Sequence, residues 1–73
     1  MSGLVKQSFS LAGHRTSVAL EPEFWQVLGE IAVAREMTLV RLVAEVDTAR
    51  GADRPLAQAL RVFALTKRGD FSH

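Results

Sequence analysis

The sequence predicts a small, mainly α-helical domain with one short β-strand, which pairs antiparallel with the same strand of a second subunit. Three observations support this. Residues 14–20 alternate between two kinds of side chain, as a strand with one buried face does. Three apolar stripes at helical spacing follow. The chain has only 73 residues and no cysteine, so a partner subunit is the simplest way to complete its core.

The strand is expected over residues 14–20, before a change of period at Glu21 and Pro22. Its backbone N–H and C=O groups need partners, because unpaired buried groups are costly. The same strand of another subunit supplies them through a two-fold axis. A weaker alternation over Lys6–Leu11 offers the alternative, a hairpin that turns at Ala12 and Gly13. The apolar face of the strand carries Thr16, Val18 and Leu20, and the opposite face carries Arg15, Ser17 and Ala19.

Three helices are expected after the strand. The first runs over about residues 22–35, because Pro22 suits the first position of a helix. The second runs over about 38–50, with Thr38 as its N-cap and Gly51 beyond its end. The third begins at Pro55. The expected organisation is an N-terminal arm over 1–13 that could include a short strand, a core over 14–50, a linker over 51–54, a C-terminal helix over 55–67 and a frayed tail over 68–73.

Composition excludes several classes of protein. No apolar run approaches the roughly 18–20 residues of a membrane span, and no apolar stretch typical of a secretory signal follows Lys6, so we expect a cytoplasmic protein. The two histidines, His14 and His73, lie far apart, so no metal site is expected. No nucleophile–base pair, carboxylate pair or phosphate-binding loop is evident. We therefore expect neither an enzyme nor a cofactor.

The charge is low for a nucleic-acid-binding protein, with a net value of +1. Basic residues dominate before Glu21 and from Arg50 onward, whereas acidic residues dominate between Glu21 and Asp47. An ordinary solvated surface could carry the same pattern. If the chain binds DNA, this charge predicts weak non-specific binding and a modest dependence on salt.

The order of strand, proline, helix, short threonine-containing turn and helix resembles the ribbon–helix–helix family of bacterial DNA-binding repressors and antitoxins. The segment Thr16–Trp25, TSVALEPEFW, is similar to that family's passage from strand to helix. Gly13–Ser17 (GHRTS) and Ala59–Phe63 (ALRVF) are similar to a subgroup of short bacterial members. The resemblance covers about residues 13–65.

The resemblance implies a homodimer that inserts a two-stranded β-ribbon, one strand from each subunit, into the DNA major groove. That groove admits such a ribbon and shows a distinct pattern at each base pair. The implied base contacts are Arg15, Ser17 and Ala19. Arginine can pair with guanine and serine can donate or accept, whereas Ala19 can touch only a thymine methyl group.

The resemblance also places a phosphate clamp at the start of the second helix, where unpaired N–H groups favour anions. The implied contacts are Thr38, Leu39, Val40 and Arg41. The alternative for Arg41 is an ion pair with Glu45, four residues further on. The dimer core is expected to comprise Thr16, Val18, Leu20, Phe24, Leu28, Ile31, Leu42, Val43 and Val46, with Trp25 covering the C-terminal helix or the partner subunit.

Two functions follow from these expectations. The first is a dimeric, sequence-specific transcriptional regulator, such as a repressor, that could assemble further on DNA through the C-terminal helix. The alternative is a protein-interaction module or antitoxin-like partner, built on the same dimer, that binds DNA weakly or not at all. Ala19 and the acidic middle of the chain favour a further interpretation, a scaffold dimer that has lost DNA binding.

Overall fold

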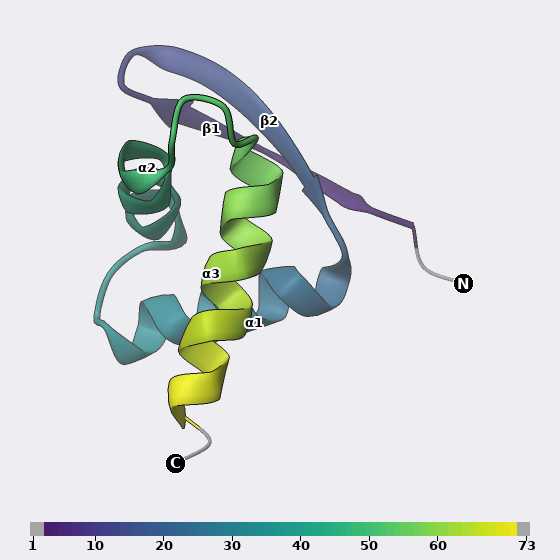
Figure 1. Ribbon diagram of the computed structural model, residues 1–73, viewed down its shortest axis with the longest axis vertical. Helices are drawn as coiled ribbons and strands as arrows, with labels where there is room; N and C mark the ends of the chain where they lie inside the picture. The colour runs from purple at the N-terminus through teal and green to yellow at the C-terminus, as the bar shows by residue number, and fades with distance from the viewer. Residues whose placement is uncertain (1–2, 72–73) are drawn as a thin grey trace.

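The computed structural model describes residues 3–71, with side chains described as far as residue 67. Two strands precede three helices, in the order β1 (Val5–Leu11), β2 (His14–Leu20), α1 (Pro22–Ala34), α2 (Leu39–Ala49) and α3 (Leu56–Phe71) (Figure 1). In that view the hairpin of β1 and β2 runs along the top of the molecule, and the helices lie on one side of it. The expected strand and three helices are present, with one further strand before them.

The hairpin turns at two residues that both have positive φ, Ala12 at 50° and Gly13 at 82°. This is the geometry of a type I′ turn, whose twist matches that of the strands beside it. The register pairs Leu11 with His14 next to the turn and Val5 with Leu20 at the far end. Each strand of this two-stranded sheet therefore has one edge without a neighbouring strand in the described chain.

The sequence predicts a single strand that pairs only with a second subunit. This prediction is wrong, because β2 already pairs with β1 of its own chain. The observed arrangement is the alternative in which Lys6–Leu11 folds back. The N-terminal segment therefore forms a paired strand over Val5–Leu11 and is not an unpaired arm there. The sequence signal for this turn is weak, because alanine, which disfavours positive φ, precedes Gly13.

The two faces of the hairpin differ in burial, as the alternation in β2 predicts. Phe9 and Leu11 of β1 are buried beside Val18 and Leu20 of β2, and the intervening residues face away from them. This inner face supplies four of the buried apolar side chains of the core. β1 is therefore an integral part of the fold.

The helix boundaries agree closely with the sequence, except at the C-terminus. Pro22 opens α1, and Arg35 follows its last residue. Thr38 caps α2 as expected, since its hydroxyl oxygen accepts the N–H of Arg41 at 3.1 Å. The helix α3 continues to Phe71, four residues beyond the expected end. The rest of the expected frayed tail, residues 72–73, lies outside the described residues.

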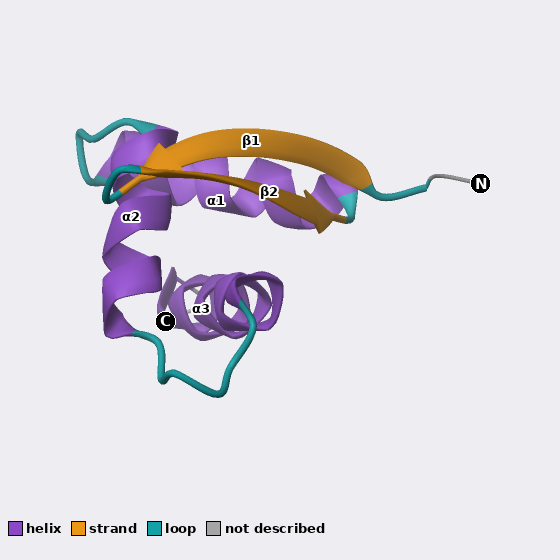
Figure 2. Cartoon of the chain, turned by 90° about the horizontal axis from the view of Figure 1, so that it is seen from above, coloured by secondary structure: helices purple, strands orange, loops and turns teal. Residues whose placement is uncertain are grey.

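The core is assembled from every element of the single chain. Leu20, Leu28, Leu42 and Leu60 have no exposed surface, and they come from β2, α1, α2 and α3. The helix α3 packs against α1, α2 and β2, whereas α2 packs against β1 as well as the other two helices. Figure 2 shows the loop before α2 on the β1 side of the hairpin and the loop after α2 on the opposite side. In this view the two ends of α2 therefore lie on opposite sides of the hairpin.

Candidate nucleic-acid interface

The three predicted base-contact residues lie on the outer face of the hairpin. Arg15 and Ser17 are exposed and Ala19 is half-buried. Val18 and Leu20, which alternate with these residues along the strand, are buried. This follows from the two-residue period of a strand, which sends alternate side chains to opposite faces. The side chains of this face are accessible to a large partner.

The strand β1 contributes the other half of this outer face. The register places Lys6 opposite Ala19, Ser8 opposite Ser17 and Ser10 opposite Arg15. All three side chains of β1 at these positions are exposed. These three residues were not among the predicted contacts, although the alternation over Lys6–Leu11 indicates that they share one face of a strand.

Two hydroxyl groups are joined across the outer face. The Oγ atoms of Ser8 and Ser17 lie 3.0 Å apart in a hydrogen bond that links β1 to β2. A hydroxyl group has one donor and two acceptor positions, so each serine can still bond to another group. The pair fixes the position of the Ser17 hydroxyl without using up its capacity.

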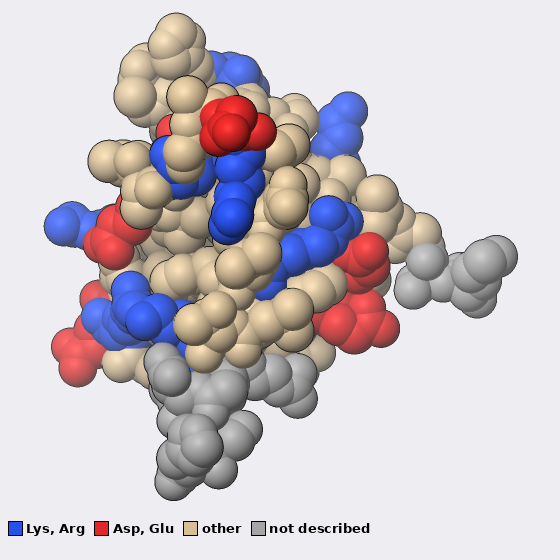
Figure 3. All heavy atoms as spheres, viewed as in Figure 1, with Lys and Arg blue, Asp and Glu red and all other residues tan. Residues whose placement is uncertain are grey.

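The outer face carries positive charge only. Lys6 and Arg15 lie toward opposite ends of the hairpin, and its other outward residues are serines and an alanine. The face shown in Figure 3, with α3 in front, instead mixes basic and acidic side chains. The low net charge of the chain thus conceals a local excess of positive charge on this face, in agreement with the basic residues that precede Glu21 in the sequence.

Trp25 of α1 holds β1 in place. Its indole Nε1 donates a hydrogen bond to the carbonyl oxygen of Val5 at 2.7 Å. Its ring also lies 5.9 Å from that of Phe9, measured between centroids, at an angle of 39°. Trp25 is 7% exposed. Its hydrogen-bond and ring partners therefore lie on β1, in addition to its place in the core that α3 also joins.

The second group of predicted contacts lies at the start of α2. Thr38, Val40 and Arg41 are exposed, whereas Leu39 is half-buried and packs against the core. Leu39 and Val40 can offer only their backbone N–H groups to an anion, and Thr38 already accepts a bond from the Arg41 N–H. The charged group available here is the Arg41 guanidinium.

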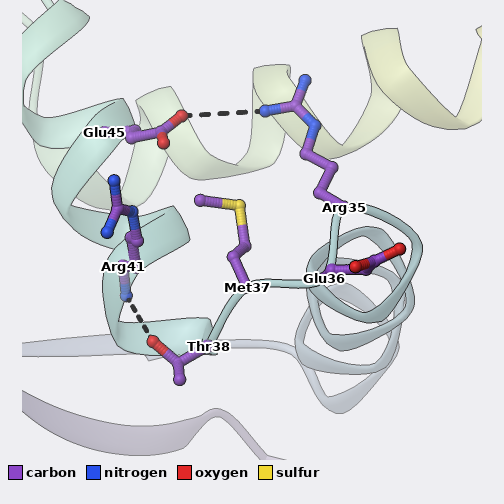
Figure 4. Close-up of a pocket in the computed structure, with 6 residues that line it drawn as sticks. All are labelled: Arg35, Glu36, Met37, Thr38, Arg41 and Glu45. Carbon is purple, nitrogen blue, oxygen red and sulfur yellow. Dashed lines mark hydrogen bonds and ion pairs between the residues drawn. The ribbon is translucent and has the colours of Figure 1, made fainter.

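A surface hollow adjoins this helix end (Figure 4), lined by Arg35, Glu36, Met37, Thr38, Arg41 and Glu45. Glu45 forms an ion pair with Arg35, with 3.8 Å between Oε1 and Nη1. The alternative pairing of Arg41 with Glu45 is therefore not observed. Among the described residues, the Arg41 guanidinium has no ion-pair partner.

The expected dimer-core residues belong largely to the core of a single chain. Thr16 and Phe24 are half-buried. The other seven are buried, namely Val18, Leu20, Leu28, Ile31, Leu42, Val43 and Val46. They pack with buried residues that the expected set lacked, which are Phe9, Leu11, Trp25, Ala32, Ala59, Leu60 and Ala64. The additional residues come mainly from β1 and α3, which close the core within the chain.

Among residues 3–71, no group of three or more His, Cys, Asp and Glu residues is arranged to hold a metal ion. No helix among them has the length and apolar character needed to cross a membrane.

Comparison with known proteins supports the family suggested by the motifs. Residues 4–67 match the family model of the ribbon–helix–helix domain. Curated proteins and solved structures give no significant match. Ribbon–helix–helix domains are generally DNA-binding, dimer-forming and non-enzymatic. Because the match spans nearly all of the chain and agrees with the observed fold, this protein belongs to the ribbon–helix–helix family.

Proposed function

We propose that the chain is a sequence-specific transcriptional regulator of the bacterial cytoplasm, a repressor that binds DNA as a homodimer. The observation that carries this proposal is the outer face of the hairpin, which exposes Arg15 and Ser17 and carries no acidic residue. A β-ribbon fits the major groove, where hydrogen-bonding groups of base pairs are accessible. The family membership makes DNA the expected partner of such a face.

The three outward residues of β2 have different roles in this proposal. Arg15 reads a guanine, because its guanidinium can donate two parallel bonds to the O6 and N7 atoms of that base. Ser17 donates or accepts at a neighbouring base edge. Ala19 contributes only an apolar contact with thymine, so most of the discrimination depends on Arg15.

The start of α2 positions the protein on the DNA backbone. The N–H groups of Leu39 and Val40 and the Arg41 guanidinium bind a phosphate, and the Thr38 cap fixes the end of the helix. Contacts of this kind set orientation without reading sequence. The absence of an Arg41–Glu45 pair supports this role, because the guanidinium is not already neutralised by that neighbour.

The dimer forms in this proposal through the free edge of β2, against the same edge of a second copy. An unpaired strand does not by itself require the dimer, because β1 of the same chain already covers one edge of β2. The dimer is supported by the remaining unpaired edge of β2 and by membership of the ribbon–helix–helix family. Light scattering should give a mass of about twice 8.0 kDa at micromolar concentration. A folded monomer under these conditions would contradict the dimer.

Selection from a pool of randomised DNA duplexes tests the function directly. We expect enrichment of a short motif in two symmetric half-sites, and a gel shift on DNA upstream of the protein's own gene. If neither motif nor shift is found at low salt, the proposal fails. The same folded dimer would then fit the alternative of a protein-interaction module.

A further inference from the structure

We propose that β1 is part of the DNA-contacting surface, and that Lys6 contacts a DNA backbone phosphate at the edge of the major groove. This inference rests on the proposed function. Lys6 lies on the outer face directly opposite Ala19, the one predicted base-contact position without a polar group. Lys6 is exposed, and it forms no ion pair with any described residue. Its ammonium group is therefore available to an external anion.

The backbone next to Lys6 is held firmly. The neighbouring carbonyl of Val5 accepts the indole N–H of Trp25 at 2.7 Å, and Phe9 further along β1 is buried against the same ring. The outer face is also tied together by the Ser8–Ser17 hydrogen bond. Lys6 thus extends from an anchored strand, which lowers the entropic cost of placing its charge at a fixed position.

The arrangement of the elements brings DNA over β1. The strand β2 carries the predicted base contacts, whereas α2, whose start carries the predicted phosphate contacts, packs against β1. Figure 2 shows β1 on the same side as the loop that leads into α2, with β2 on the side toward α3. A duplex that contacts both β2 and the start of α2 therefore approaches the hairpin from the β1 side.

The width of the four-stranded sheet of a dimer indicates that Lys6 contacts a phosphate and not a base. If two copies pair through β2, the four strands in the order β1–β2–β2–β1 span about 14 Å between outer backbones, at roughly 4.8 Å per interval. The major groove is only about 12 Å wide. The two central strands enter the groove, and each β1 lies over a groove wall, where backbone phosphates are the available acceptors.

The test compares Lys6→Ala with wild type on an enriched operator and on random DNA at several salt concentrations. We expect weaker binding to both DNAs by similar factors. The slope of log affinity against log salt should decrease in magnitude by about two, since each lost phosphate contact contributes about 0.9 and the dimer has two. Lys6→Arg should retain most of the slope. Arg54→Ala is the charge-matched control, because its loop lies on the far side of the molecule from β1 and its loss should leave the slope unchanged (Figure 2).

The outcomes separate this inference from the proposed function. If Arg15→Ala weakens operator binding while Lys6→Ala changes neither affinity nor slope, the inference is overturned and the proposed function stands. A loss on the operator alone would show that Lys6 reads a base, which overturns the phosphate assignment. If wild-type protein binds no DNA, the proposed function itself fails. Circular dichroism of each variant checks that the fold is retained.

Discussion

Arg61 and Glu21 join two segments that lie 40 residues apart in the chain. The Arg61 Nε donates to the Glu21 Oε1 at 3.0 Å, and the guanidinium also lies 5.9 Å from the centroid of the Phe24 ring. Glu21 is the single residue between β2 and α1, so this contact ties α3 to the junction of the strand with the first helix. It forms at the solvent-exposed edge of the core.

The Glu21–Arg61 contact predicts a pH dependence of stability. A backbone N–H bond, and after it Arg61, lower the pKa of Glu21 below its ordinary value. The stabilisation is therefore fully present above the unfolded-state pKa and disappears as pH falls through the lower folded-state pKa. Glu21→Gln should lower the thermal midpoint slightly at neutral pH, and the difference from wild type should vanish in acid. Thermal unfolding at several pH values measures this, and a constant difference across that range would contradict it.

Trp25→Phe should destabilise the protein by removing the hydrogen bond to the Val5 carbonyl while keeping an aromatic ring. A net hydrogen bond contributes about 0.5–1.5 kcal/mol, and an acceptor left without a partner adds to the loss, so we expect about 1–3 kcal/mol in total. Urea unfolding followed by circular dichroism gives the value. Unchanged stability would show that β1 is not anchored through this bond.

Ala12→Asn should stabilise the hairpin. Alanine at φ 50° is strained by roughly 1 kcal/mol, whereas asparagine tolerates this region and Asn-Gly is a favoured type I′ sequence. We expect a gain of about 0.5–1 kcal/mol in the free energy of unfolding. The opposite change, Gly13→Ala, should destabilise, because a side chain is disfavoured at φ 82°. Stabilisation by both substitutions would rule out this turn geometry.

Arg15→Ala should reduce operator affinity by roughly 1–3 kcal/mol and relax discrimination at one position of each half-site, as loss of a bidentate base contact does. Folding should be unaffected, since the side chain is exposed. Titration of operator variants at fixed salt measures both effects. Equal affinity of mutant and wild type would remove Arg15 from the groove.

Arg41→Ala should weaken binding to operator and random DNA by similar factors, because phosphate contacts do not read sequence. The salt slope should fall in magnitude by about one for each contact removed, and hence by about two for the dimer. The Arg54→Ala variant again serves as the control for a lost charge. An unchanged slope would exclude Arg41 from the DNA-binding site.

Much of the helical part of the fold could be predicted because its signals are local. Pro22 and the hydroxyl of Thr38 mark helix starts through geometry within a few residues, and both are found where expected. The inward and outward faces of β2 likewise follow from a two-residue period. The predicted base contacts Arg15 and Ser17 accordingly lie on the exposed face.

The features that the sequence did not predict depend on contacts between residues distant in the chain, or on an atypical turn residue. Ala12 carries little of the turn signal that asparagine or aspartate would give, so β1 was expected only as an alternative. The partner of Trp25 depends on how α1 packs against β1, which spacing along the chain does not specify. The pairing of Glu45 with Arg35, in place of Arg41, likewise depends on how α1 and α2 meet.

The Ala12–Gly13 turn also determines how this sheet can form during folding. Its strands are neighbours in the sequence, so their pairing closes only a short loop and is an intramolecular step, with hairpins typically forming within about 1–10 μs. A ribbon made solely of strands from two chains would instead require an encounter between them. We therefore expect the refolding rate of β1 and β2 to be independent of protein concentration, with any concentration dependence confined to the later joining of two preformed hairpins.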